Sequence, residues 1–141
     1  MSIKVQGLDE AIRALSKYGD EVARDTAKAM NTSMLAVQSS AKRRAPVDTG
    51  RLRASIVTTK ASKEDLVAST VVGVNYAPYI EFGTGAYARD YLASQDSEMQ
   101  RYAMQFYING RGKLPARPFL FPAFEQERPK LEKELAKLLK R

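Results

Sequence analysis

One long amphipathic helix constrains the fold more than any other feature of this sequence. Between residues 20 and 45, small or apolar side chains recur every three or four positions and so line one helical face. They are Val22, Thr26, Ala27, Met30, Met34, Val37 and Ala41. Pro46 disfavours helical backbone at the residue before it, so the helix should end at or just before Ala45. A chain of 141 residues has room for one core, which predicts a single domain, residues 1–141.

The partners for that helical face lie on both sides of it in the sequence. Two β-rich runs, Ser55–Ala61 and Leu66–Asn75, flank a polar stretch that can turn the chain, which favours an antiparallel hairpin. Residues Ile3–Gln6 can add a further strand. From Leu120 onward, large apolar residues again share one helical face. They are Phe124, Leu131, Leu135 and Leu138.

The composition removes most enzyme chemistry. The chain has no His and no Cys, which excludes a Ser-His-Asp triad, a thiol nucleophile and cysteine metal sites. The tripeptide at residues 48–50 matches that of aspartic proteases, but basic residues flank it where an apolar strand is needed. Residues 83–88 fit G-x-G-x-x-A without the βαβ unit of a dinucleotide site. We therefore predict a non-enzyme without cofactor, metal or small-molecule substrate, and no apolar run is long enough for a membrane span.

The net charge of +7 is concentrated in short segments. Five of the basic residues fall between positions 42 and 53, with one acidic residue among them. They are Lys42, Arg43, Arg44, Arg51 and Arg53. The first three suit the C-terminal end of a helix, where cations are favoured, but the last two are not explained in this way. Phosphate groups or the carboxylates of a protein partner could use them, which leaves nucleic-acid binding and protein assembly as two hypotheses.

Three sequence blocks follow one another in a distinctive order. Residues 45–56 read APVDTGRLRASI, residues 74–85 read VNYAPYIEFGTG, and residues 116–124 read ARPFLFPAF. Together they resemble the tail-completion and head–tail joining proteins of long-tailed double-stranded DNA bacteriophages and prophages, over about residues 8–140. The positions that carry these motifs in a structural role are Pro46, Asp48, Thr49, Gly50, Glu81, Gly83, Thr84, Gly85, Pro118, Phe119 and Leu120.

The resemblance implies an α+β fold in which a long N-terminal helix and a C-terminal helix pack on a small, mainly antiparallel β-sheet. It implies a structural virion-assembly protein that forms a ring of six copies at the tail–head junction, as a tail-completion, tail-terminator or neck component. Its partners would be its own copies, the tail-tube protein and head-side connector proteins. Assembly would take place in the host cytoplasm before the subunit joins the virion, and residues 86–113 would form a variable insertion.

Two groups of side chains are candidates for the contacts of such a subunit. The basic group is expected to contact a neighbouring subunit or an acidic partner, or alternatively to bind nucleic acid without sequence specificity. It comprises Arg43, Arg44, Arg51 and Arg53. The aromatic group is either local core or a protein contact surface, because tyrosine is enriched in both. It comprises Tyr76, Tyr79 and Phe82. The proline-bounded segment 118–122 is predicted to pack the last helix onto the sheet.

Overall fold

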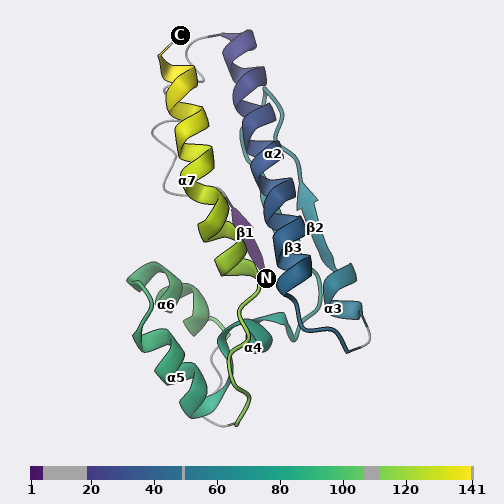
Figure 1. Cartoon of the computed structure of the whole chain (residues 1–141), viewed down its shortest axis with the longest axis vertical. Coiled ribbons are helices and arrows are strands. Elements are labelled where there is room, and N and C mark those ends of the chain that lie inside the picture. The colour runs from purple at the N-terminus through teal and green to yellow at the C-terminus, as the bar shows by residue number, and fades with distance from the viewer. Residues whose placement is uncertain (5–18, 49, 107–111, 141) are drawn as a thin grey trace.

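Two long antiparallel helices form the body of the molecule (Figure 1). The computed structural model describes residues 1–4, 19–48, 50–106 and 112–140. Helix α2 spans Asp20–Arg44 and helix α7 spans Leu120–Leu139. The two helices lie side by side, with the end of α7 next to the start of α2. Each therefore buries the apolar stripe that its sequence periodicity predicts.

The boundaries and the buried face of α2 confirm the sequence prediction. The helix ends at Arg44, and Ala45 has the extended backbone that a following proline favours, with φ −62° and ψ 132°. The side chains of Met30, Met34 and Val37 have no exposed surface, and the alanines on the same face are buried as well. On α7, Leu131 and Leu135 are buried opposite them in the same core.

A three-stranded sheet packs beside α2. Its strands are β1 (Ser2–Lys4), β2 (Ile56–Thr59) and β3 (Ser69–Val72). The order is β1-β3-β2 and both pairings are antiparallel, so the predicted hairpin is confirmed. An N-terminal strand joins it at Ser2–Lys4, whereas the predicted range is residues 3–6, of which 5 and 6 lie outside the described residues. Reciprocal backbone hydrogen bonds between Ser62 and Asp65 close the polar turn in the connection between β2 and β3.

Polar contacts fix the sheet against α2. The hydroxyl groups of Thr58 and Thr70 both lie 3.3 Å from the backbone carbonyl of Met34. The side-chain amide of Asn31 donates to the carbonyl of Ala61 at 3.0 Å and accepts from its N–H at 2.7 Å. These bonds satisfy buried or half-buried polar groups. They therefore fix the position of the sheet along α2, in addition to the apolar packing between the two.

Four shorter helices surround the end of the molecule where α2 ends and α7 begins. They are α3 (Arg51–Ala54), α4 (Ala77–Phe82), α5 (Gly85–Ala93) and α6 (Ser97–Met104). Figure 1 shows α5 and α6 projecting on one side of the body, while α3 lies on the other side. We refer to residues 85–106, which contain α5 and α6, as the arm.

The core has two parts. The main cluster lies between α2, α7 and the sheet, and its largest fully buried side chains include Phe119, Met30 and Ile56. A smaller cluster, built on Phe82, Met99 and Ala103, attaches the arm. The half-buried ring of Phe121 packs against both clusters and so connects them.

Candidate functional site

The three sequence blocks meet at the start of α7. Ala45 and Leu52 from the first block, Ala77 from the second and Phe119 from the third all belong to the main buried cluster. Segments that are far apart in the sequence are therefore held together by one core. We refer to this meeting point as the junction.

Glu81 is the polar centre of the junction. Its side chain is fully buried, and its Oε2 accepts hydrogen bonds from the backbone N–H groups of Phe119 at 2.6 Å and Leu120 at 3.1 Å. Its Oε1 accepts a third from the N–H of Phe121 at 2.8 Å. The first N–H groups of a helix have no partner within the helix, and the capping residue Phe119 has no side-chain acceptor. The carboxylate of Glu81 therefore caps α7 from another helix, where a negative charge is favoured.

Two ionisable groups at the junction are perturbed. Burial raises the pKa of the Glu81 carboxyl, and the hydrogen bonds from Phe119, Phe121 and Leu120 oppose this rise. Burial also raises the pKa of Tyr91 to about 12, with a further contribution from the negative charge of Glu81. Within the described ranges, no buried side-chain nitrogen or oxygen lacks a hydrogen-bond partner. The junction is thus a satisfied structural network.

The glycines of the second block permit a close approach of two backbones. The N–H of Thr84 donates to the carbonyl of Leu114 at 2.8 Å, and the N–H of Leu114 donates to Thr84 Oγ1 at 2.9 Å. Gly83 has φ +77°, and a Cβ there would lie 2.7 Å from the nitrogen of Ala116. A side chain would therefore separate the two segments. Close packing therefore accounts for the glycine at position 83, whereas Gly85, the first residue of α5, has a positive φ of 59° that suits glycine.

The first block forms a tight turn between α2 and β2. Gly50 caps α3 with φ +81° and ψ −2°, a left-handed conformation that suits glycine. Leu52 is buried below it, Pro46 is half-buried and Asp48 is exposed. No side chain caps α3, and the exposed carboxylate of Asp48 lies in this turn between α2 and α3. Thr49 lies outside the described residues.

The four arginines of the basic group are all exposed, and we call them the basic corner. Arg43 and Arg44 lie in the last turn of α2, and Arg51 and Arg53 lie in α3, which packs against α2. Arg44 donates to Gln126 Oε1 at 3.1 Å and to Ser40 Oγ at 3.2 Å, which ties it to α7 and to its own helix. Among the described residues, no ion pair joins Arg43 or Arg53 to a carboxylate.

The aromatic group is divided by burial. Phe82 is buried in the smaller cluster, with its ring centroid 5.6 Å from that of Phe121 and 6.3 Å from that of Tyr102. Its ring therefore serves as local core in the isolated chain. Tyr76 is half-buried against the main cluster and Tyr79 is half-buried in α4. In the third block Pro118 is half-buried, while Phe119 and Leu120 are fully buried.

The sequence identified Glu81 but not its partners, and it indicated Phe121 only as part of the segment 118–122, while Tyr91 was missed. A single carboxylate inside the apolar run 79–82 is a recognisable signal, because such a group needs donors when buried. The donors are identified only by the fold, since they are backbone N–H groups of a distant segment.

Comparison with known families supports the resemblance over the part of the chain that contains the first block and most of the second. A family model described as "Bacteriophage HK97-gp10, putative tail-component" matches residues 9–83, just over half of the chain. The chain belongs to this family. The match includes the first block and most of the second, and it contains Glu81 but not the backbone groups that Glu81 caps. No curated protein and no solved structure matched the chain.

Membership of the HK97-gp10-like family makes the chain a phage tail component, which is a structural protein of the virion. The described residues contain no group of three or more His, Cys, Asp or Glu side chains that could hold a metal ion. In the same part of the chain, no helix is long and apolar enough to cross a membrane.

Proposed function

We propose that this HK97-gp10-like protein is a ring-forming subunit at the tail–head junction of a phage, as a tail-completion, tail-terminator or neck component. Six copies would form the ring, in contact with the tail-tube protein on one side and head-side connector proteins on the other. Assembly would take place in the host cytoplasm, and the ring would then become part of the virion. Family membership supports the tail role, and the motif blocks support the position within the tail.

The observation that carries this proposal is the position of the basic corner beside the junction. Arg43 and Arg53 lie on helices that the junction holds in place, so their charges have a defined arrangement. Exposed cations on a packed scaffold suit a protein interface, because little ordering is needed to bring them onto a partner's carboxylates. Partly exposed Tyr76 and Tyr79 would extend such an interface.

Electron microscopy and native mass spectrometry of the purified protein test the proposal directly. The expected result is a closed ring of six copies, formed by the protein alone or on addition of tail-tube or connector protein. A protein that stays monomeric at high concentration under all of these conditions would contradict the proposal. Depletion of the protein during phage growth should give heads and tails that fail to join, and complete virions would be the contrary result.

Nucleic-acid binding is a second candidate function, because four arginines gather at one exposed corner. Contact through phosphate groups would give an affinity for duplex DNA that falls steeply with salt and does not depend on sequence. A gel-shift titration between low and physiological salt measures this dependence. Absence of binding at low salt would eliminate this function and leave the proposal for the ring unaffected.

A further inference from the structure

We infer that the ring forms by a head-to-tail contact in which the arm of one copy docks on the basic corner of the next. The inference rests on the proposed function, since it names the two surfaces by which copies of this chain would join. The arm comprises residues 85–106. The corner, as the docking surface, comprises the four arginines of the basic corner together with the other exposed side chains of residues 43–48 and 50–57.

The positions of the two surfaces support a cyclic contact. Figure 1 shows the arm and α3 on opposite sides of the body, both at the end where α2 ends and α7 begins. Two different surfaces on opposite sides of a subunit allow each copy to contact two neighbours. A contact of this kind gives a closed ring when the rotation between copies divides a full turn.

Both surfaces carry apolar side chains that the isolated chain leaves exposed. On the arm, Tyr87 is 51% exposed and Met104 is 71% exposed. On the corner, Val47 is 56% exposed and Val57 is 52% exposed. Val57 alternates along β2 with Ile56 and Thr58, which face α2, and so it points away from the body's core. Apolar groups of this kind form the centre of protein interfaces.

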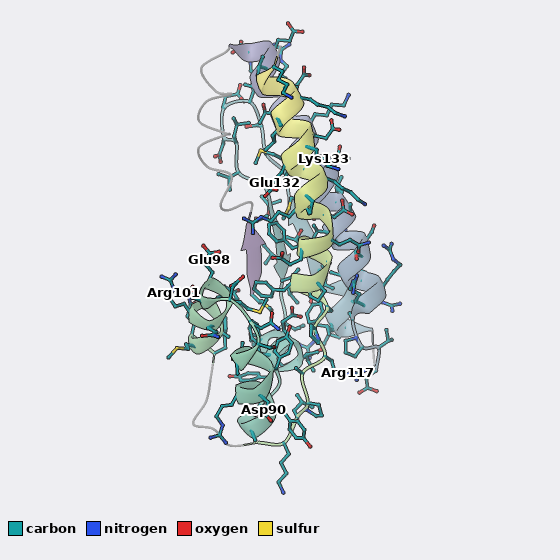
Figure 2. The ribbon with its side chains drawn as sticks, turned by 60° about the vertical axis from the view of Figure 1, so that its left-hand side comes forward. Asp90, Glu98, Arg101, Arg117, Glu132 and Lys133 are labelled. Atoms are coloured by element: carbon teal, nitrogen blue, oxygen red, sulfur yellow. The ribbon has the colours of Figure 1, made fainter. Side chains whose placement is uncertain are left out.

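The charges of the two surfaces are complementary. The arm carries two basic and three acidic residues, a net charge of −1, whereas residues 42–53 carry a net charge of +4. Asp90 on α5 and Glu98 on α6 are exposed, and no ion pair joins them to another described residue (Figure 2). Figure 2 also shows Arg101 on α6, so the acidic side chains supply only part of the arm's surface.

The same charges argue against the alternative two-fold arrangement. The arm and the corner lie on opposite sides of the body, so the two surfaces cannot pair reciprocally across one two-fold interface, and a symmetric dimer through the corner alone would place two basic corners face to face. Like charges brought together in an interface cost several kcal/mol, which disfavours that dimer. The arm of a second copy is therefore the occupant that the corner's charge favours.

Charge reversal at both surfaces tests the inference. The corner variant carries Arg43→Glu, Arg51→Glu and Arg53→Glu, which change the net charge of residues 42–53 from +4 to −2. The arm variant carries Asp90→Lys and Glu98→Lys, which change the net charge of the arm from −1 to +3. Each variant alone would bring like charges together at every contact, so its self-association should weaken by more than about tenfold. An equimolar mixture should assemble again, because corners and arms of opposite charge then alternate around the ring. Only rings with an even number of copies can close in this way.

A matched control carries Arg24→Glu and Lys133→Glu, which reverse two exposed charges on the long helices away from both surfaces. It should assemble like the wild-type protein, and all variants should keep the wild-type circular dichroism spectrum. The inference would be overturned if the corner and arm variants assembled normally, or if their mixture did not regain self-association. Ring formation by the wild-type protein would still support the proposed function in that case. Wild-type protein that forms no ring under any condition would overturn both.

The absence of cysteine permits a second, covalent test. A variant with Val57→Cys and Met104→Cys, treated with a short bismaleimide, should give a ladder of covalent multimers on a denaturing gel. A variant with Leu35→Cys and Met104→Cys is the control, because Leu35 is 41% exposed on α2 but belongs to neither surface. It should give no ladder. An equal yield from the two variants, or none from the first, would contradict docking of the arm on the corner.

Discussion

The carboxylate of Glu81 and the backbone N–H of Phe119 are joined by a hydrogen bond of 2.6 Å across 38 positions of the sequence. The same oxygen, Oε2, also accepts from the N–H of Leu120, and the other carboxylate oxygen, Oε1, accepts from the N–H of Phe121. The start of α7 is thus defined by a residue from α4. Changes at this position should affect the whole molecule.

Replacement Glu81→Gln should destabilise the fold by about 1–3 kcal/mol, because the amide NH₂ group would face backbone donors that need an acceptor. Urea unfolding at pH 4, where the contribution of Glu81 is fully present, measures this change when it is followed by circular dichroism. Glu98→Gln is the matched control on the exposed surface of α6, and it should alter stability by less than about 0.5 kcal/mol. Equal stability of the two variants would show that the capping bonds contribute nothing.

The contribution of Glu81 should depend on pH in a definite direction. Because burial raises its pKa above the ordinary value of 4.5, the folded state binds the proton more tightly than the unfolded state does. The stabilising contribution is therefore fully present below pH 4.5 and is lost as the pH rises through the folded-state pKa. The difference in unfolding free energy between wild type and Glu81→Gln should shrink between pH 4 and pH 8. If the difference in unfolding free energy instead grew with pH, the three hydrogen bonds from the backbone would lower the pKa of Glu81 by more than burial raises it.

Two glycines with similar φ values differ both in ψ and in the space around the missing side chain: Gly50 has ψ −2°, whereas Gly83 has ψ −170°, a region that is essentially restricted to glycine. Gly50→Ala should cost about 1–2 kcal/mol, since φ is +81° but no atom lies within 4 Å of the added Cβ. Gly83→Ala should cost more than about 3 kcal/mol, because its Cβ would also lie 2.7 Å from Ala116 and 2.8 Å from Leu114 backbone atoms. Chemical denaturation of both variants gives the comparison. Similar losses at the two sites would contradict the close approach of the segments.

Phe82→Ala should loosen the arm more than the body. The substitution removes the ring that packs on Phe121 and Tyr102, with an expected cost of about 3–5 kcal/mol. Hydrogen exchange should then show reduced protection in residues 85–106 at conditions where α2 keeps its protection. Uniform loss of protection over the arm and α2 would instead indicate that the two core clusters unfold as one unit.

The parts of the fold that local patterns determine could be predicted from the sequence. The apolar stripe of α2, its end before Pro46 and the apolar face of α7 follow from helical periodicity and proline geometry. Helices α4 and α5 could not be found in this way, since residues 76–96 have little periodicity. Their connection is held by backbone bonds between Thr84 and Leu114.

The candidate site was predictable to a smaller extent. The basic corner is visible as a charge cluster, because its four arginines are close in the sequence as well as in the fold. The capping role of Glu81 could not be predicted, since the groups that donate to its carboxylate are backbone N–H groups, which carry no sequence signal. The burial of Phe82 was equally undetermined, because an aromatic residue beside a glycine suits either a core or an interface.

The separation between Glu81 and its donors also has a consequence for the order of events during synthesis. When α4 has just been synthesised, the residues whose N–H groups its carboxylate caps have not yet been made, so the anion must remain hydrated. Its dehydration must wait until the segment around Phe119 arrives, together with the helix that covers α2. Closure of the core and docking of the terminal helix are therefore one late, long-range step, which predicts slower folding than a local helical bundle would show.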